Sequence, residues 1–287
     1  MANAQKIAVV SNPQSGHNRH KGIGKFEALI AAHGAASAQA VGFDEMEAAL
    51  KTLAAARPEI LVINGGDGSV DMAVNLMRNQ KIFEKEPALA LLKGGTTNLI
   101  HRDVGLRDRP GRALKRILSR DLRVVERRPL EIRRAGNDEV LYGFFMGTGA
   151  VPRAIEEARK TLHSKGLRGH AGEVLMLASV LARLRFKRDL EGDAVLSPAP
   201  LMIDDAEKQH IFCALTSLQK LVPGVSSPAE ADKIGGLYVG GEKRVLERAQ
   251  YECLHLSTAQ PWVLDGEMQD AGEIDVRMGK ALKFLVA

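Results

Sequence analysis

Three short segments of the sequence combine glycine with small polar residues, a pattern typical of loops that bind phosphate. They are Asn12-Pro13-Gln14-Ser15-Gly16, Gly65-Gly66-Asp67-Gly68-Ser69 and Gly94-Gly95-Thr96-Thr97-Asn98. Because glycine has no side chain, backbone N–H groups in such loops can approach phosphate oxygens closely. A helix that begins directly after the loop also favours negative charge. One such loop is a weak signal, since strand-to-helix turns often need glycine for steric reasons, but three together indicate a nucleotide site.

The second segment also contains a carboxylate, Asp67. Beside a triphosphate, this group would repel the phosphate oxygens unless it acted through Mg²⁺, a water molecule or a substrate proton. The alternative is structural, with Asp67 capping the helix that follows the segment.

Two common nucleotide-binding patterns are absent from the sequence. No Gly-x-x-x-x-Gly-Lys-Ser/Thr motif occurs, and the first strand-to-helix turn lacks Gly-x-Gly-x-x-Gly. A P-loop enzyme and a Rossmann dehydrogenase are therefore disfavoured.

Cys213 and Cys253 fit no metal or redox spacing, so we expect two free thiols in a reducing compartment rather than a disulfide.

Each of the three segments follows a short apolar run with the character of a buried strand. These runs, together with one further predicted strand, cover residues 6–11, 37–41, 59–64 and 88–93. Helical periodicity separates them and continues beyond them, at residues 23–30, 44–53, 69–79 and 109–118. The alternation predicts a Rossmann-like, three-layer α/β domain over residues 1–128, with a parallel sheet covered on both faces. The three segments should then meet beyond the carboxyl ends of the strands, where such sheets bind ligands.

The pattern changes after Arg128-Pro129. Short strand-like runs separated by turn residues predict an antiparallel, β-sandwich-like second domain over residues 129–287. A helical segment at about residues 152–188 interrupts these strands. Its later part is apolar and then basic, so it either packs against the β-rich domain or contacts lipid, on a bilayer or along an acyl chain.

Four motifs in order resemble those of the diacylglycerol kinase catalytic family, which includes bacterial lipid kinases, sphingosine kinases and ceramide kinases. They are Asn12-Pro13-x-Ser15-Gly16, Gly65-Gly66-Asp67-Gly68-Ser69, Gly95-Thr96-x-Asn98 and Leu264-Asp265-Gly266-Glu267. Residues 146–150, Met-Gly-Thr-Gly-Ala, also resemble a glycine-rich strand end of this family. The Gly-Gly-Asp-Gly motif alone is shared with NAD kinases and phosphofructokinases, whereas the set of four spans nearly the whole chain and is more specific.

This resemblance implies an ATP-dependent lipid kinase that transfers the γ-phosphoryl group to a hydroxyl of diacylglycerol or a related lipid alcohol. ATP and Mg²⁺ would bind between the α/β domain and the β-rich domain. The residues implied to bind ATP are Asn12, Pro13, Gln14, Ser15, Gly16, Gly65, Gly66, Asp67, Gly68, Ser69, Thr96 and Asn98.

The resemblance also implies roles for individual carboxylates. Glu267 matches the proton acceptor of the family, and Asp67 matches the aspartate that organises the phosphates and the metal. Asp265 either orients Glu267 or caps the turn at Gly266. Asp232 corresponds to a Mg²⁺ position of bacterial members.

The sequence departs from the family pattern at several positions. Asp71-Met72 replace a common Asn-Glu, Lys93-Gly94 replace a proline before Gly-Thr, and the segment after Asp232 differs from Asp-Gly-x-Leu. Two other hypotheses therefore stay open: a nucleotide- or lipid-binding protein without turnover, and a kinase for a soluble substrate, as in NAD kinases. Retention of Asp67 and Glu267 argues against the first. The Asn12-Pro13-x-Ser15-Gly16 and Leu264-Asp265-Gly266-Glu267 motifs argue against the second.

Composition bears on the partners and the location. Aromatic residues make up only 4% of the chain, which argues against a nucleic-acid binder that relies on base stacking. The formal net charge is +5, with an excess of basic residues over residues 102–134 that would suit phosphates or an anionic bilayer, or would simply be a solvated surface. With neither a secretory signal nor a membrane-spanning run, we expect a cytoplasmic protein that meets its lipid at the inner face of the membrane. Oligomeric state is not encoded in any motif.

Overall fold

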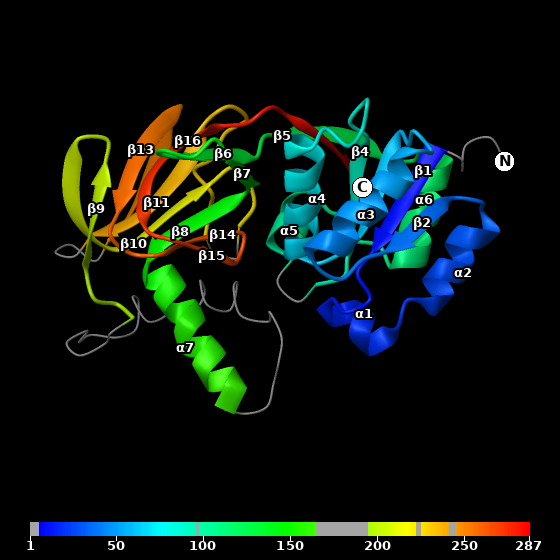
Figure 1. The fold of residues 1–287 in the computed structure, drawn as a ribbon, viewed down its shortest axis with the longest axis horizontal. Helices are drawn as coiled ribbons and strands as arrows, with labels where there is room; N and C mark the ends of the chain where they lie inside the picture. Colours follow the sequence, from blue (N-terminus) through cyan, green and yellow to red (C-terminus); the bar gives the residue numbers. More distant parts are fainter. Residues whose placement is uncertain (1–5, 96–97, 165–194, 222–224, 241–244) are drawn as a thin grey trace. The chain divides into compact units, whose positions relative to one another are not determined.

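The computed structural model describes residues 6–95, 98–164, 195–221, 225–240 and 245–287 (Figure 1). The chain divides into two compact units. Unit 1 contains Met1–Arg127 and Ala281–Ala287, and unit 2 contains Arg128–Lys280. The expectation that residues 129–287 all belong to the second domain is therefore wrong at its end, because the last strand pairs within the sheet of unit 1.

The described part of unit 1 contains a six-stranded sheet in the order β2-β1-β3-β4-β17-β5. Its strands are β1 (Ile7–Ser11), β2 (Ala36–Gln39), β3 (Ile60–Gly65), β4 (Ala88–Lys93), β5 (Arg123–Arg127) and β17 (Leu282–Val286). Every neighbouring pair is parallel except β17 with β5. The predicted parallel α/β fold is confirmed, with one antiparallel edge strand.

Helices cover both faces of this sheet. They are α1 (Gly16–Lys21), α2 (Gly24–Ala32), α3 (Phe43–Ala54), α4 (Asp67–Asn79), α5 (Leu99–Val104) and α6 (Pro110–Ser119). Side chains alternate along a strand, so Ile7 and Val9 of β1 share one apolar cluster with residues of α2 and α6, while Ala8 and Val10 are buried on the other face. The helix predicted at residues 44–53 is α3, which begins at Phe43 after Gly42, so that Asp44 lies in its first turn.

Unit 2 is built on an antiparallel sheet with eleven strands among the described residues. Nine of them follow the order β15-β14-β8-β10-β9-β13-β16-β6-β7, and β11 pairs with β10 and β12. The first six in the chain are β6 (Leu130–Arg134), β7 (Val140–Gly143), β8 (Phe145–Gly149), β9 (Ala199–Ile203), β10 (Ala206–Thr216) and β11 (Ile234–Gly240). The others are β12 (Leu246–Tyr251), β13 (Cys253–Thr258), β14 (Trp262–Leu264), β15 (Glu267–Gln269) and β16 (Gly272–Met278).

One apolar cluster joins residues from both ends of this sheet. It includes Leu130 on β6, Leu201 on β9, Trp262 on β14 and Val276 on β16, all of them buried. A single sheet whose ends share a core must curl around it, so the predicted antiparallel β-rich domain is confirmed, as one continuous curled sheet. The helix α7 (Ala150–Ser164) follows β8, as Figure 1 shows, and covers the start of the helical segment predicted at about 152–188. Residues 165–188 of that prediction lie outside the described residues.

Cys213 is buried and Cys253 is exposed, and both are free thiols as predicted. Among the helices described, none is both long enough and apolar enough to span a membrane.

Candidate nucleotide site and candidate base

The three predicted loops lie together at one edge of the sheet of unit 1. The first loop (residues 12–16) follows β1, the second (65–69) spans the end of β3 and the start of α4, and the third (94–98) follows β4. Because β1, β3 and β4 are adjacent and parallel, their carboxyl ends coincide. Backbone hydrogen bonds tie the loops together: the N–H of His17 donates to the carbonyl of Gly94 at 2.8 Å, and the N–H of Gly94 donates to Gly65 at 3.0 Å.

Asparagine side chains shape the first loop. The Oδ1 atom of Asn12 accepts the N–H of Gln14 at 2.9 Å, and its Nδ2 atom donates to Ser69 Oγ at 3.2 Å, which joins the first loop to the second. Buried Asn18 donates through Nδ2 to the carbonyls of Asn12 and Asn64, at 2.9 and 3.1 Å. Asn18 and Asn64 were not among the predicted site residues. The sequence did offer one sign of the role of Asn64, because it is a polar residue in an otherwise apolar predicted strand.

The glycines of the second and third loops have a steric role, because they allow these two loops to pack closely together. A Cβ atom on Gly95 would lie 2.5 Å from the Cα of Gly66, and one on Gly94 would lie 2.8 Å from the Cα of Gly65. Contacts this short cannot be relieved without moving backbone, so the two loops can pack together only where both lack side chains. Gly68, in the first turn of α4, differs, because a Cβ there would meet nothing within 4 Å. Its neighbourhood leaves room for a ligand at the start of α4.

Asp67 is buried, and both of its carboxylate oxygens accept backbone hydrogen bonds from the start of α5. Its Oδ2 atom accepts the N–H of Leu99 at 2.6 Å, and its Oδ1 atom accepts the N–H of Ile100 at 3.2 Å. Burial raises the pKa of this carboxyl to about 6, although these N–H groups oppose the rise. Asp67 thus caps a helix, but the helix is α5 rather than the one that follows its own loop.

The third loop ends at Asn98, which has a left-handed backbone (φ +51°) and precedes α5. Its side chain accepts the N–H of Gly95 at 3.1 Å and donates to the carbonyl of Gly95 at 2.6 Å. Asn98 therefore closes the loop on itself. Thr96, the other residue predicted here, lies outside the described residues.

Glu267 lies in unit 2, whereas Asp67 and the three loops lie in unit 1. It is the first residue of the short strand β15 and is exposed, so its carboxylate is open to solvent. Asp265, two residues earlier, is buried and accepts the N–H groups of Phe144 and Phe145. The role of Glu267 as a base stays a prediction that rests on the motif.

The described residues do not by themselves form a complete metal site. Within the part of the chain that the structure describes, no three or more His, Cys, Asp or Glu side chains form a group that could hold a metal ion. Asp232 is exposed just before β11. Both oxygens of Asp67 already accept N–H groups, which suits an organising role better than direct ligation. Mg²⁺ commonly binds through substrate phosphates and one or two carboxylates, so these residues would fit it only together with ATP.

The architecture of both units is that of the diacylglycerol kinase-like fold. Residues 6–127 match the family model of the diacylglycerol kinase catalytic domain, which confirms the predicted resemblance for this stretch. No curated protein was found as a relative of the sequence.

Three solved structures from Bacillus anthracis str. Sterne are similar along nearly the whole chain, the first two described as a proposed diacylglycerol kinase and the third as a diacylglycerol kinase. The first has 17% identity and a TM-score of 0.68, and the match covers 98% of this chain and 97% of that one. The second has 18% identity and a TM-score of 0.67, with coverage of 98% and 96%. The third has 17% identity, a TM-score of 0.65 and the same coverage as the second. Likeness at this identity shows the fold alone.

Proposed function

We propose that this protein is an ATP-dependent lipid kinase that transfers the γ-phosphoryl group of ATP to a hydroxyl of diacylglycerol or a related lipid alcohol. The observation that carries the proposal is the meeting of three glycine-containing loops at the carboxyl edge of β1, β3 and β4, within the stretch that matches the kinase family. The start of α4 at Asp67-Gly68 offers backbone N–H groups and an unobstructed approach to phosphate oxygens.

In this mechanism the chain mainly positions and stabilises charge, as is usual for phosphoryl transfer. The first and second loops bind the phosphates of ATP, and Asp67 holds the start of α5 so that the third loop keeps its shape. Glu267 accepts the proton of the lipid hydroxyl as that oxygen attacks the γ-phosphorus. Mg²⁺, when bound with ATP, would offset phosphate charge. A positioned base typically contributes about 10²–10⁴-fold to the rate.

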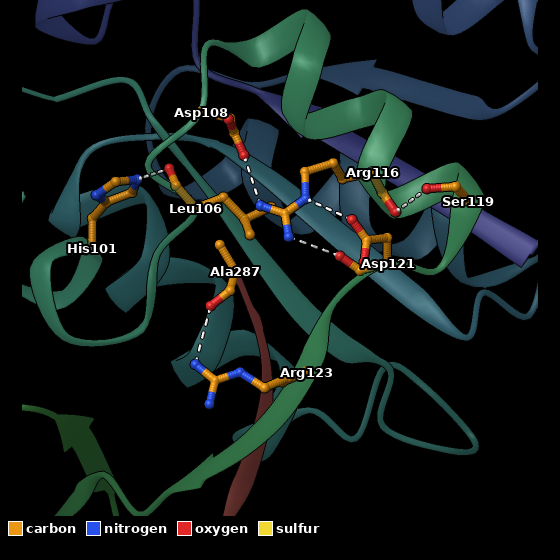
Figure 2. A network of polar contacts seen from close by, with 8 residues as sticks. All are labelled: His101, Leu106, Asp108, Arg116, Ser119, Asp121, Arg123 and Ala287. Carbon is orange, nitrogen blue, oxygen red and sulfur yellow. Dashed lines mark hydrogen bonds and ion pairs between the residues drawn. The ribbon is translucent and has the colours of Figure 1, made fainter.

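The basic stretch of residues 102–134 offers a way to reach a lipid, but only part of it is available. Figure 2 shows Arg116 between Asp108 and Asp121, with its guanidinium bound to both carboxylates. Carboxylates also hold Arg120 and Arg127. The exposed basic residues near the start of α6 are Arg107, Arg109, Arg112 and Lys115. We propose that this basic group brings the protein to the anionic inner face of a membrane.

The test is ATP consumption with Mg²⁺ and a panel of diacylglycerol, monoacylglycerol, ceramide and a sphingoid base in vesicles, with NAD as the soluble acceptor. Transfer of phosphate to one lipid, lost in Glu267→Gln while ATP affinity is kept, would support the proposal. Transfer to NAD alone would favour a kinase for a soluble substrate. ATP binding without transfer to any acceptor would favour a binding protein.

A further inference from the structure

The turn that carries Glu267 is a two-residue hairpin between β14 and β15. Its central residues, Asp265 and Gly266, both have positive φ, +43° and +95°, as in the type I′ turns that join tightly paired strands. Leu264 and Glu267 are direct partners across this hairpin. Among the described strands, β15 pairs only with β14, so the sheet supports Glu267 from one side.

Asp265 anchors this turn to the strand connection between β7 and β8. Its Oδ2 atom accepts the N–H of Phe144 at 2.7 Å, and its Oδ1 atom accepts the N–H of Phe145 at 2.8 Å. Its own N–H donates to the carbonyl of Phe145 at 2.8 Å. The residue is only 7% exposed, so these bonds are shielded from water. A turn of this type needs no such bonds to form. Together with the pairing of β14 and β8, they instead fix the position of the hairpin relative to β8.

The segment that Asp265 binds is itself held firmly. The carbonyl of Phe144 accepts Thr216 Oγ1 at 3.0 Å and the N–H of Ser217 at 3.1 Å. Thr216 is the last residue of β10, and Ser217 follows it. Gly143 leaves the space that the turn occupies, since a Cβ there would lie 2.4 Å from Leu264 Cδ1 and 3.0 Å from Asp265 Oδ2. The carboxylate of Asp265 therefore adds a side-chain link to the pairing of β14 with β8, which already joins the hairpin to the sheet.

We propose that Asp265 is a positioning residue, which holds Glu267 in the place needed for proton transfer by binding the N–H groups of Phe144 and Phe145. The proposal rests on the proposed function, in which Glu267 is the base. Asparagine has nearly the same shape as aspartate but offers only one acceptor oxygen. In Asp265→Asn the amide NH₂ would face a backbone N–H, and the hairpin would shift or loosen while both strands remained.

The experiment compares Asp265→Asn with Asp204→Asn, a matched control in the same unit. Asp204 also has positive φ (+51°) in a two-residue turn, between β9 and β10, and also accepts a backbone N–H, that of His255 at 3.0 Å. Phosphorylation of diacylglycerol in phosphatidylglycerol vesicles is measured with ATP and Mg²⁺, alongside amide hydrogen exchange of residues 140–149. Asp265→Asn should lower kcat by about 10²-fold with KM for ATP unchanged, since small misplacements of a reacting group cost about this much. Exchange should accelerate at Phe144 and Phe145, and Asp204→Asn should change neither readout.

The double variant with Glu267→Gln separates positioning from a general loss of structure. If Asp265 acts through Glu267, adding Asp265→Asn to Glu267→Gln should lower kcat no further. A further loss of the same size as in the parent background, or an unchanged kcat in folded Asp265→Asn, would overturn the proposal. If Asp265→Asn fails to fold, Gly143→Ala takes its place, because the added Cβ should displace the same hairpin and lower kcat equally. If neither variant folds, Asp265 is needed for folding only, and the positioning role is overturned.

A failure of the proposed function would give results different from a failure of the positioning role. Full turnover in Glu267→Gln, or no lipid phosphorylation by the unaltered protein, would contradict the role of Glu267 itself, and the positioning role would fall with it. Faster exchange at Phe144 and Phe145 would then show only that Asp265 anchors the hairpin.

Discussion

The Oδ2 atom of Asp67 accepts a 2.6 Å hydrogen bond from the backbone N–H of Leu99, which ties the loop of residues 65–69 to α5, the helix that follows the third loop. Asp265 does the same in unit 2, where its carboxylate binds Phe144 and Phe145. In both cases a buried carboxylate accepts two consecutive backbone N–H groups from a remote segment. Both motif aspartates therefore shape backbone, whatever else they contact when ligands bind.

The raised pKa of Asp67 predicts a specific pH dependence of stability. Its pKa is about 6 in the folded protein, against an ordinary value of 3.8, so between these values the folded state holds a proton that the unfolded state has lost. This contribution to the free energy of unfolding is fully present below about pH 4 and is lost as the pH rises through 6. A pKa difference of this size corresponds to about 3 kcal/mol. Asp67→Asn should remove that slope from urea unfolding curves taken between pH 4 and 7, and an identical slope in both proteins would contradict the assignment.

Gly68 and Gly66 should respond differently to alanine, because only Gly66 packs against another loop. Gly66→Ala places a Cβ 3.1 Å from the Cα of Gly95 and should destabilise unit 1. Gly68→Ala meets no protein atom and should leave stability equal or raise it by up to about 1 kcal/mol, as alanine does in a helix. If phosphate approaches this position, Gly68→Ala should nevertheless weaken ATP binding about tenfold, or about 1.4 kcal/mol.

Gly24→Ala is the matched control for Gly68→Ala, since Gly24 starts α2 and a Cβ there also meets nothing within 4 Å. Calorimetric titration with a non-hydrolysable ATP analogue gives the affinity, and thermal unfolding gives the stability. Unchanged affinity in a stable Gly68→Ala protein would place the phosphates elsewhere.

Membrane binding should depend on the four exposed basic residues near the start of α6. Changing Arg107, Arg109, Arg112 and Lys115 to glutamine should weaken co-sedimentation with phosphatidylglycerol vesicles, by up to about 1 kcal/mol for each charge near the surface. Added salt should weaken binding of the parent protein in the same way. A control variant removes four exposed lysines elsewhere: Lys25, Lys85, Lys208 and Lys283. Equal loss in both variants would indicate a general charge effect.

The C-terminal strand should be essential to the stability of unit 1. Phe284 on β17 is fully buried and lies in register with Leu89 on β4 and Val125 on β5. Phe284→Ala should cost about 3–5 kcal/mol, because it removes a large side chain from a packed core. Exposed Lys283→Ala should cost little, and chemical unfolding followed within unit 1 would compare them. A small effect of Phe284→Ala would mean that unit 1 does not depend on β17.

The sequence by itself determined the local elements and the edge at which the three loops meet. Apolar runs that end in glycine and polar residues, separated by helical periodicity, are enough to place β1, β3 and β4 in parallel, because parallel strands need crossover helices. The order of these strands then brings residues 12–16, 65–69 and 94–98 together. The motifs also predicted the resemblance to the diacylglycerol kinase catalytic family, because their order and spacing can be read directly from the sequence.

Only the tertiary structure decided which partners these residues have. Leu282–Val286 is an apolar strand like many others, and nothing local indicates that it leaves unit 2 to lie between β4 and β5. Likewise Asp67 could have capped its own helix, but the close packing of Gly66 against Gly95 brings the start of α5 within reach of its carboxylate. Hydrogen-bond partners far apart in the chain depend on how whole elements pack, and packing is a property of the assembled core rather than of a local sequence window.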